Sequence, residues 1–561
     1  MLQTRVIKPA ANAYQYPLLI KRLLLSGVRY ERTREIVYRD QLRYDYRTLN
    51  QRVARLANVL TAAGVKPGDT VAVMDWDSHC YLECMFAIPM IGAVVHTINV
   101  RLSPDQILYT MNHADDRFVL VNSEFVPLYQ AIAGQLTTVQ KTLLLTDGDV
   151  HDAGLPDCVG EYESLLAAAE PSYDFPDFDE DSVATTFYTT GTTGNPKGVY
   201  FTHRQLVLHT LAAAVTVGCR ENPRLMGSDD VYMPITPMFH VHAWGLPYVA
   251  TMLGLKQVYP GRYDPEYLID LWRREQVTFS HCVPTIVQML LNAKAAQGTD
   301  FKGWKITIGG SALTRGLYDQ AKASGMNLIA AYGMSETCPL ISGAHINDEL
   351  LEADEDTRST FHLKAGVPVV LVDAAIQAAD GSFLPADGAS QGELVVRAPW
   401  LTQGYYNEPE KSEELWAGGW LHTGDVAVID EMANIEIRDR IKDVIKTGGE
   451  WLSSLTLEGL ISRHEAVRDV AVVGVPDERW GERPFALVVL GEGQELNAEQ
   501  LRTFLEPAVA EGHINKWAVP QQIAVVSEIP KTSVGKLDKK RIRSEIARWQ
   551  KEGSAEQTSL S

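Results

Sequence analysis

The chain has 561 residues, of which 45% are hydrophobic and 22% are charged, and its 51 basic and 71 acidic residues give a net charge of −20. This length and composition predict a soluble, multidomain globular protein with an ample core. The acidic balance argues against nucleic acid and anionic lipid as partners unless a local basic patch exists.

Six scattered cysteines contain no Cys-x-x-Cys pair, which argues against a zinc site or a disulfide framework and indicates a reducing, cytoplasmic location. The first twelve residues lack the apolar stretch of a signal peptide. The longest apolar run, Met85 to Val95, is too short to span a bilayer and contains Pro89 and Gly92. We therefore expect a buried element there and no transmembrane segment, which leaves peripheral membrane contact open.

Apolar β-rich runs alternate with helical patterns in the first half of the chain. Residues 46–63 predict a helix, because apolar residues recur at spacings of three to four. Buried strands are predicted at residues 70–74, 118–121 and 142–145. This alternation implies parallel sheets covered by helices, so we predict an α/β fold.

The pattern changes in the second half. Residues 367–406 predict short strands with turns, which indicates a smaller β-rich subdomain. The best domain boundary lies near residues 439–443, and the remaining residues suffice for a small α+β domain. That domain is predicted to contain strands at 470–475 and 485–489 and a helix at 497–505, with Asn497 as its N-cap.

A glycine- and threonine-rich segment runs from Tyr188 to Val199. Glycines let the backbone approach a ligand, consecutive N–H groups form an anion site, and hydroxyls and a lysine add phosphate donors. It is not a Walker A loop, because Gly198 and an apolar run follow the lysine. We predict a polyphosphate site, most simply for ATP, against the alternative of an ordinary turn between strands. The candidate residues are Thr189, Thr190, Gly191, Thr192, Thr193, Gly194 and Lys197.

Two further segments carry groups suited to a nucleotide. Residues 331–337 include Tyr332, Gly333, Ser335 and Glu336, in which an aromatic ring can stack on a base and a carboxylate can hold Mg²⁺. Asp425 follows Thr423 and Gly424 and offers acceptor oxygens for two ribose hydroxyls. The alternatives are a capped helix start for the first segment and a simple turn for the second.

Three other segments combine apolar and polar groups. Residues 237–245 contain His240, His242 and Trp244 but no third metal ligand at a suitable spacing, so packed histidines are the alternative. Residues 439–451 combine charged residues with two glycines and a tryptophan. A solvent-exposed hairpin is the alternative interpretation of this composition. A loop at residues 529–536 ends in Lys536, which could neutralise developing charge in a cleft, although such a lysine is usually a surface residue.

Together these segments resemble, in order and across nearly the whole chain, the adenylate-forming enzymes: acyl-CoA synthetases, peptide-synthetase adenylation domains and luciferases. The resemblance implies a large N-terminal domain of two α/β subdomains plus a β-rich subdomain, residues 1–439, carrying the ATP and acyl sites. A small mobile α+β domain, residues 440–561, would follow and carry the catalytic lysine.

The resemblance also implies individual roles. Catalytic residues would be Lys536, Glu336 and His240, with Glu336 as the Mg²⁺ ligand. The nucleotide would be bound by the threonine loop and by Gly310, Tyr332, Gly333, Ser335, Asp425, Arg440 and Trp451. The acyl pocket would comprise His240, Trp244, Ile308 and Gly309, whereas the hinge and the CoA channel would comprise Lys442, Lys446, Gly448 and Gly449.

The expected activity is ATP-dependent, AMP-forming acyl-CoA synthesis through an acyl-adenylate, with Mg²⁺ as cofactor and a carboxylic acid, ATP and CoA as substrates. The motifs resemble those of bacterial medium-chain fatty-acid CoA ligases, and relatives with similar motifs activate aryl, alicyclic or methylthio-propionic acids. A ligase that transfers to a carrier-protein thiol and a non-catalytic adenylate-binding protein are the alternatives. A homodimer is possible, and pocket depth, which decides chain length, is not visible in the sequence.

Overall fold

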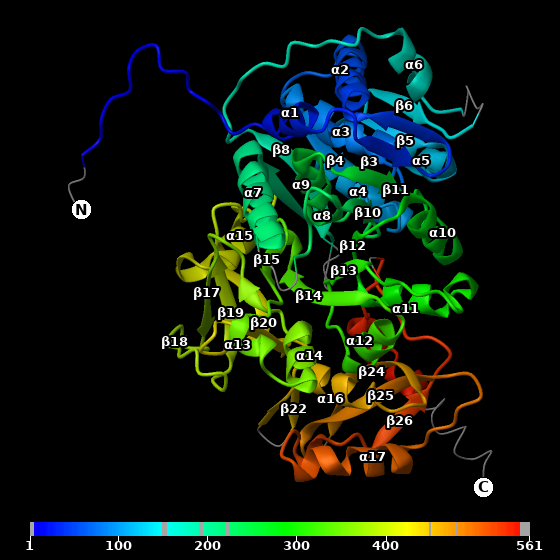
Figure 1. The fold of residues 1–561 in the computed structure, drawn as a ribbon, viewed down its shortest axis with the longest axis vertical. Helices are drawn as coiled ribbons and strands as arrows, with labels where there is room; N and C mark the ends of the chain where they lie inside the picture. The colour runs from blue at the N-terminus through cyan, green and yellow to red at the C-terminus, as the bar shows by residue number, and fades with distance from the viewer. Residues whose placement is uncertain are drawn as a thin grey trace.

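The computed structural model describes residues 5–148, 154–189, 195–219, 224–447, 450–477, 479–533 and 535–549, with only the backbone described at residues 450 and 451. Figure 1 shows a large upper part and a smaller lower part, the latter formed by the end of the chain and drawn mainly in orange and red. Three β-sheets build the upper part and one builds the lower part.

A seven-stranded sheet, in the order β7-β6-β5-β3-β4-β8-β9, lies near the top of Figure 1. Its neighbouring strands are parallel except for the antiparallel pair β8 and β9. Parallel strands buried on both faces are continuous apolar runs, which is why they were visible in the sequence. The strands are β3 (Thr70–Met74), β4 (Val94–Thr97), β5 (Asp116–Asn122), β6 (Lys141–Leu145), β7 (Cys158–Glu161), β8 (Val183–Thr189) and β9 (Lys197–Thr202).

A nine-stranded sheet, in the order β16-β15-β14-β13-β12-β10-β11-β1-β2, forms the second α/β unit. Its centre is parallel and both of its edges are antiparallel. The strands are β1 (Glu35–Tyr38), β2 (Leu42–Asp45), β10 (Val231–Pro234), β11 (Lys256–Tyr259), β12 (Phe279–Cys282), β13 (Lys305–Ile308), β14 (Asn327–Gly333), β15 (Leu340–Gly343) and β16 (Val367–Pro368).

Helices pack against these two sheets, and many begin at residues whose side chains cap the helix. Asp45 accepts a hydrogen bond from the N–H of Thr48 at the start of α2, and Ser103 and Gln106 form a capping box at α4. The helices are α1 (Lys21–Tyr30), α2 (Tyr46–Ala62), α3 (His79–Met90), α4 (Pro104–His113), α5 (Val126–Ala133), α6 (Tyr162–Ala168), α7 (His203–Cys219), α8 (Val241–Trp244), α9 (Leu246–Leu253), α10 (Pro265–Glu275), α11 (Pro284–Asn292), α12 (Arg315–Ala323), α13 (Asp348–Leu351) and α14 (Glu355–Leu363).

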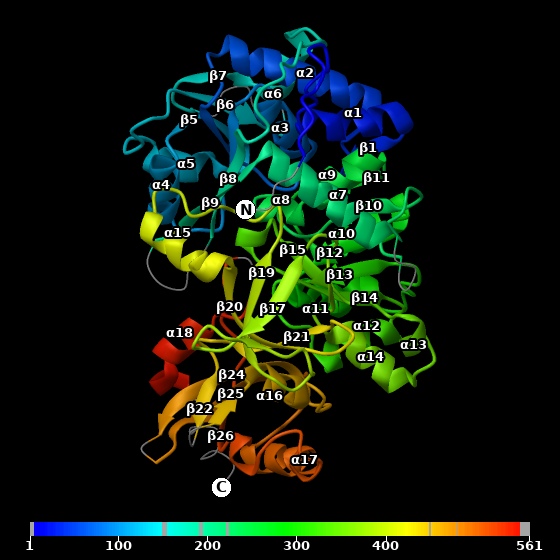
Figure 2. The same ribbon diagram turned by 90° about the vertical axis from the view of Figure 1, so that its left-hand side faces the viewer.

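A five-stranded antiparallel sheet completes the upper part and is seen in yellow-green in Figure 2. Its order is β18-β17-β19-β20-β21, and α15 (Pro409–Leu415) connects β19 to β20. The strands are β17 (Asp373–Gln377), β18 (Phe383–Leu384), β19 (Gly392–Arg397), β20 (Leu421–Ile429) and β21 (Ile435–Arg440).

The lower part is built on a long antiparallel pair of strands, β24 and β25, and both β22 and β26 pair with the edge of β25 that faces away from β24. Alternate residues of β24 face opposite sides, so Val470 and Val472 belong to one core cluster and Ala471 and Val473 to another. The elements are β22 (Ile445–Thr447), β23 (Glu450–Leu452), α16 (Ser454–Ile461), β24 (Val467–Asp477), β25 (Gly481–Leu490), α17 (Ala498–Ala510), β26 (Gln522–Val525) and α18 (Lys539–Ser544). Short 3-10 turns occur along the whole chain at Ser123–Phe125, Lys294–Ala296, Ser335–Thr337, Ala417–Gly419 and Lys516–Ala518.

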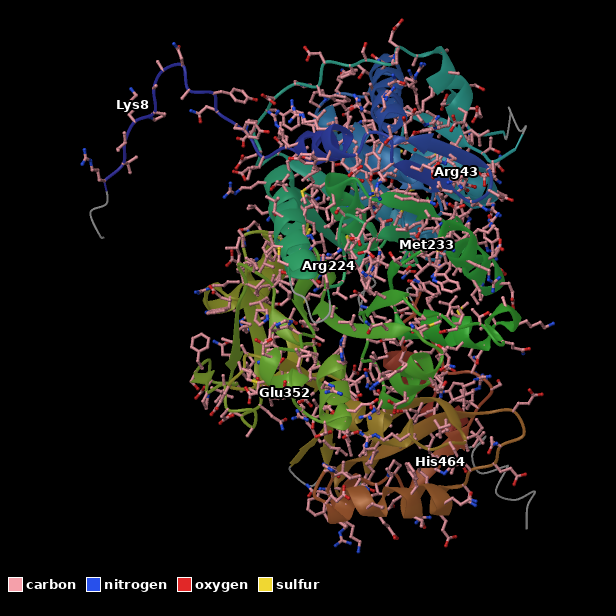
Figure 3. All side chains as sticks on the ribbon, viewed as in Figure 1. Lys8, Arg43, Arg224, Met233, Glu352 and His464 are labelled. Carbon is pink, nitrogen blue, oxygen red and sulfur yellow. The ribbon has the colours of Figure 1, made fainter. Side chains whose placement is uncertain are left out.

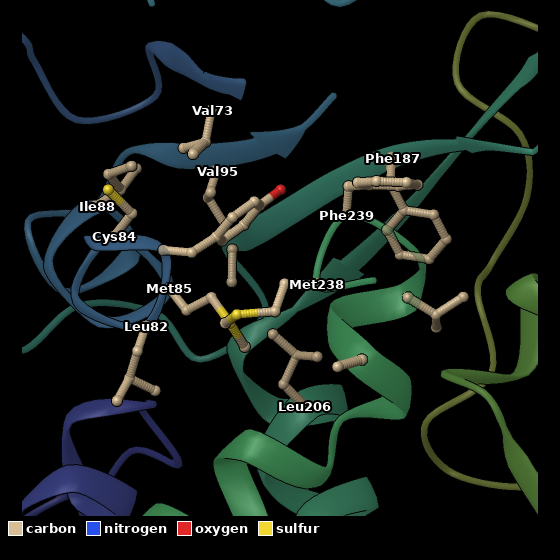
Figure 4. Close-up of a cluster of buried hydrophobic side chains, with 14 of the residues drawn as sticks. Val73, Leu82, Cys84, Met85, Ile88, Val95, Phe187, Leu206, Met238 and Phe239 are labelled. Atoms are coloured by element: carbon tan, nitrogen blue, oxygen red, sulfur yellow. The ribbon is translucent and has the colours of Figure 1, made fainter. Parts of the chain in front are cut away.

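The largest core cluster packs the seven-stranded sheet against the segment that leads to His240 (Figure 4). Met85 of α3 lies beside Met238, and Phe239 lies near Phe187 of β8. Met238 and Phe239 are 0% and 3% exposed, so the backbone just before His240 is fixed by close packing.

The predicted α/β fold is confirmed, and the expected elements coincide with α2, β3, β5 and β6 and with the long strands of the lower part. The apolar run 85–95 divides between α3 and β4, and Gly92 takes a positive φ of 81° in the turn between them. The helix predicted at 497–505 extends to Ala510. No helix in the described part of the chain is long and apolar enough to cross a membrane.

The chain passes from the five-stranded sheet to the sheet of the lower part between Arg440 and Ile445. The domain boundary between residues 439 and 440 is consistent with this change of sheet and stays a prediction. All six cysteines are free thiols. Figure 3 shows Met233 inside the upper part and His464 in the lower part.

Trp304 anchors the core of the nine-stranded sheet, and its replacement should be costly. It is fully buried, stacks on Trp272 with a centroid distance of 5.5 Å, and donates from Nε1 to Ser280 Oγ at 3.0 Å. We expect Trp304→Ala to lower the free energy of unfolding by about 3–5 kcal/mol, measured by urea denaturation followed by circular dichroism. Trp517→Ala is the matched control because Trp517 is 37% exposed, and a similar loss there would contradict the assignment.

Candidate active site

A cavity at the carboxyl ends of the parallel strands brings together residues from four of the segments predicted from the sequence. Gly309 and Gly310 follow β13, whereas Tyr332 and Gly333 end the neighbouring strand β14. The carboxyl edge of a parallel sheet is a common place for ligands. The predicted residues that line the cavity are His240, Trp244, Gly309, Gly310, Tyr332, Gly333, Ser335 and Lys536.

The aromatic and acidic groups predicted for base and ribose are joined to each other. Tyr332 Oη donates to Asp425 Oδ2 at 2.6 Å, and Arg440 Nε lies 3.5 Å from Asp425 Oδ1. Asp425 and Arg440 are opposite each other in the antiparallel pair β20 and β21, so the backbone fixes their proximity. Burial raises the pKa of Asp425, whereas the positive charge of Arg440 opposes the rise.

Glu336 and Lys197 are brought together by Tyr405, which the sequence analysis did not single out. Tyr405 Oη donates to Glu336 Oε1 at 2.8 Å, and Lys197 Nζ lies 4.3 Å from the centroid of the Tyr405 ring. Lys197 begins β9 opposite Thr189, the last residue of β8. Thr190, Gly191, Thr192, Thr193 and Gly194, predicted for phosphate binding, lie outside the described residues.

Lys536 reaches the cavity from the lower part of the molecule. A methyl group on Gly310 would lie 3.1 Å from Lys536 Cε, so the lysine stem passes directly over this glycine. The loop that carries Lys536 is held by the upper part, because Thr285 Oγ1 donates to Gly535 O at 3.2 Å and Asn99 Nδ2 donates to Ser533 Oγ at 3.2 Å. Thr285 ends a segment, residues 281–285, that the resemblance placed in the pocket wall, whereas Asn99 was not predicted because only the tertiary arrangement shows its bond to Ser533.

The electrostatics of Lys536 are unusual for a lysine. Burial and the nearby Arg440 lower its pKa to about 8, although the carboxylates of Asp425 and Glu336 oppose the shift. His240 is half-buried at the same cavity, and burial together with the charge of Lys536 lowers its pKa to about 3. At neutral pH the site therefore presents a neutral imidazole beside a largely protonated amine.

A strained turn presents Trp244 to the cavity. Residues 241 to 244 all have positive φ, between 47° and 60°, and Gly245 follows with a φ of 71°. Left-handed backbone costs about 1–2 kcal/mol for each non-glycine residue and persists only where its surroundings impose it. Trp244 packs on His281, with ring centroids 5.1 Å apart, and a methyl group on Gly309 would lie 3.1 Å from the indole.

His242, for which the sequence suggested no role, supports this turn from inside the core. It is fully buried, and its Nε2 lies 2.6 Å from Thr185 Oγ1, which itself donates to Val95 O at 3.0 Å. The only hydrogen of the Thr185 hydroxyl is donated to Val95 O, so Thr185 Oγ1 accepts a hydrogen bond from His242 Nε2–H. Burial lowers the pKa of His242 to about 3, so the imidazole stays neutral.

Beyond Trp244 the cavity wall is mainly apolar. The further lining residues include Thr216, Val217, Leu225, Leu246, Phe279 and Thr307. Ile308, predicted for the acyl pocket, instead belongs to the core of the nine-stranded sheet and is 1% exposed. Successive strand residues face opposite sides, so Thr307 and Gly309 face the cavity and Ile308 faces away.

Of the predicted hinge and CoA residues, Lys442 lies in the connection between Arg440 and Ile445, and Lys446 lies in β22. Lys442 and Lys446 are exposed, and Lys446 N donates to Glu482 Oε2 at 2.8 Å. Gly448 and Gly449 lie outside the described residues, and so does the side chain of Trp451.

One group of potential metal ligands occurs among the described residues, away from the cavity. His79, Cys80 and Glu163 have ligand atoms within 4.8 Å of one another. However, the guanidinium of Arg52 donates to both oxygens of Glu163 at 2.8 and 2.6 Å, so this carboxylate is already paired with a positively charged side chain. The group is an ion-pair network rather than a metal site.

Comparison with models of protein families identifies the family of this chain. The family model described as AMP-binding enzyme matches residues 26–406, and its companion, AMP-binding enzyme C-terminal domain, matches residues 456–536. The chain belongs to the AMP-binding enzyme family. The predicted membership of the adenylate-forming superfamily is therefore confirmed.

Relatives within this family extend over nearly the whole chain. A long-chain-fatty-acid–CoA ligase of Thermus thermophilus is 39% identical over 510 residues, covering 90% of this chain and 91% of the relative. A 3-methylmercaptopropionyl-CoA ligase of Ruegeria pomeroyi is 37% identical, covering 88% and 90%. A medium-chain-fatty-acid–CoA ligase of Ectopseudomonas oleovorans is 34% identical, covering 94% and 95%.

Solved structures share this fold. The anthranilate CoA ligase in complex with anthranoyl-AMP superposes with a TM-score of 0.83 at 21% identity, covering 95% of this chain and 98% of that one. ATP-bound MatB from Rhodopseudomonas palustris gives a TM-score of 0.79 at 24% identity, covering 94% and 99%.

The lowered pKa of Lys536 can be measured without substrates. We expect competitive acetylation with acetic anhydride, followed by peptide mass spectrometry, to show Lys536 reactivity rising with a midpoint near pH 8, because only the neutral amine reacts. Ordinary lysines titrate near pH 10.4. A midpoint for Lys536 at that ordinary value would contradict its burial in the cavity.

Proposed function

We propose that this chain is an ATP-dependent, AMP-forming fatty acyl-CoA synthetase that works through an acyl-adenylate. The observation that carries the proposal is the cavity that joins Lys536 and His240 to the Tyr332–Asp425 pair and continues as an apolar pocket. The names of the relatives, which include long- and medium-chain fatty-acid CoA ligases, support the same reaction.

The nucleotide would be held by the groups around Tyr332. The ring of Tyr332 and the backbone of Gly333 and Gly310 would contact adenine, and Asp425 with Arg440 would bind the ribose hydroxyls. Ser335 would face the α-phosphate, while the threonine loop and Lys197 would hold the β- and γ-phosphates.

Glu336 fits a magnesium ion, because its buried carboxylate is a hard oxygen ligand fixed by Tyr405. A bound Mg²⁺ ion would neutralise negative charge on the phosphates. The residues of the chain would hold the reacting groups in position.

In the first half-reaction a carboxylate oxygen attacks the α-phosphorus of ATP. A bond from that oxygen to phosphorus forms, the bond to the pyrophosphate oxygen breaks, and pyrophosphate leaves with the electron pair. The protonated amine of Lys536 would stabilise the charge on the carboxylate and phosphate oxygens, and neutral His240 would border the acyl group.

In the second half-reaction the thiolate of CoA attacks the acyl carbon and AMP leaves. The proposed division is residues 1–439 and 440–561, with rotation at Lys442 that withdraws Lys536 and presents the CoA channel. Lys446, Gly448 and Gly449 would border that channel, and Trp451 would close over adenine. A cytoplasmic location and a homodimer stay predictions.

The acyl group is proposed to be a medium-chain fatty acid. Trp244, Gly309 and the apolar residues behind them would surround the chain. Another carboxylic acid is the second candidate, because a relative that covers most of the chain is a 3-methylmercaptopropionyl-CoA ligase. Transfer to a carrier-protein thiol is a further alternative, which CoA-dependent release of AMP would exclude.

The deciding experiment is a pyrophosphate-release screen over straight-chain acids from acetate to palmitate, with methylthio-propionate and benzoate included. AMP release is measured with and without CoA. We expect the highest kcat/KM among medium-chain acids and a strict need for CoA in the complete reaction. Failure of every acid to release pyrophosphate would refute the proposed function.

Replacement of Lys536 should separate the two half-reactions. We expect Lys536→Ala to reduce adenylation by about 10²-fold or more, because the charge that stabilises the reacting oxygens is lost. Thioester formation from supplied acyl-adenylate should stay largely intact. Adenylation is measured by ATP–pyrophosphate exchange, and the second step by thioester formation from acyl-adenylate and CoA. An equal loss in both would contradict the proposal that the two half-reactions use different positions of the lower part.

Replacement of Trp244 should change the choice of acid. We expect Trp244→Ala to shift the kcat/KM profile toward longer or bulkier acids, because loss of the indole opens space beside Gly309. The profile is measured from C4 to C16 with saturating ATP, and Trp517→Ala is the exposed control. An unchanged profile with a raised KM for ATP would remove Trp244 from the acyl pocket.

A further inference from the structure

The lower part of the molecule contacts the upper part at a second place, away from the Lys536 loop. Helices α12 and α16 are in contact, and a cleft lined by Arg315, Gly316 and residues 462–465 lies at this junction. Figure 1 places α12 directly above the lower part. His464, which lines the cleft, is labelled in the lower part in Figure 3.

Gly316 is the closest approach within this contact. A methyl group on Gly316 would overlap the carbonyl oxygen of Ser462 and would lie 3.1 Å from its carbonyl carbon. Gly316 lies in the first turn of α12, and its φ is not in the positive range that favours glycine. Alanine is the better helix former, so the helix itself gives no reason for glycine at this position.

Neither side of the contact can yield easily. Leu317 and Tyr318, which follow Gly316, are buried in the core of the nine-stranded sheet. On the other side Ser462 is the C-cap of α16, and Leu457 and Ile461 of that helix are fully buried in the core of the lower part. The obstacle is a backbone carbonyl, which no rotamer change can move away.

The same orientation of the lower part brings Lys536 into the cavity. Thr285 and Asn99 hold the Lys536 loop only while the two parts are docked in this way. We propose that Gly316 is a positioning residue: the absence of a side chain there lets α16 seat against α12 and so permits the arrangement that forms the adenylate. This proposal rests on the proposed function for its kinetic consequence, but the docking itself does not.

The test is Gly316→Ala, with Gly459→Ala as the matched control. Gly459 lies on the facing helix α16, and a methyl group there would meet no atom within 4 Å. For Gly316→Ala we expect ATP–pyrophosphate exchange to fall about tenfold or more, as overpacking of a rigid contact predicts. Thioester formation from octanoyl-adenylate and CoA should stay within about twofold of the unchanged chain, because that step does not use this docking.

A second readout needs no activity. In Gly316→Ala the pH midpoint of Lys536 acetylation should rise from near 8 toward the ordinary lysine value near 10.4, because the undocked lysine leaves the cavity and regains its hydration. Gly459→Ala should match the unchanged chain in all three measurements. Thermal melting of both variants reports whether they fold.

The outcomes are distinct. Unchanged exchange and unchanged Lys536 labelling in Gly316→Ala would overturn the inference, and so would equal loss of both half-reactions with a lowered melting temperature. If the unchanged chain shows no exchange with any acid, the proposed function fails. The pH midpoint of Lys536 labelling alone then decides the docking role of Gly316: a midpoint raised above that of the unchanged chain supports the role, and an unchanged midpoint overturns it.

Discussion

The proposed chemistry depends on holding one half-buried ammonium group in the cavity. Lys536 belongs to the lower part, yet its stem passes over Gly310 of the upper part and its charge lies near Asp425 and Glu336. A lysine loses hydration when it enters such a cavity, and its lowered pKa records that loss. The position is therefore maintained by contacts elsewhere, at the loop that Thr285 holds and at the meeting of α12 and α16.

The other groups of the proposed site come from separate sheets. The nine-stranded sheet supplies Tyr332, the five-stranded sheet supplies Asp425 and Arg440, and the seven-stranded sheet supplies Lys197. Tyr332, Arg440 and Lys197 lie at or next to the ends of their strands, whereas Asp425 lies inside β20. Docking of the lower part adds the positive charge of Lys536 to this set, and in the proposed function its withdrawal would let one cleft serve two successive reactions.

Much of this was predictable from local sequence. The strand at residues 70–74 and the helix at 46–62 follow from hydrophobic periodicity, and Asn497 was recognisable as an N-cap. The pairing of Tyr405 with Glu336 and that of His242 with Thr185 were not predictable, because they join residues far apart in the chain. Ile308 shows a different limit: a strand of known position still has two faces, and a shift of one residue exchanges them.

The left-handed turn at residues 241–245 has a consequence for altering the pocket. Four consecutive non-glycine residues there occupy a backbone conformation that an isolated peptide would abandon, so their geometry belongs to the surrounding core rather than to their own sequence. In a library that randomises this turn, most variants would lose the left-handed backbone conformation instead of gaining a new pocket shape. Diversity introduced at Thr307, Leu246 and Phe279, which line the cavity from regular elements, would change its volume while the scaffold that aims Trp244 stays in place.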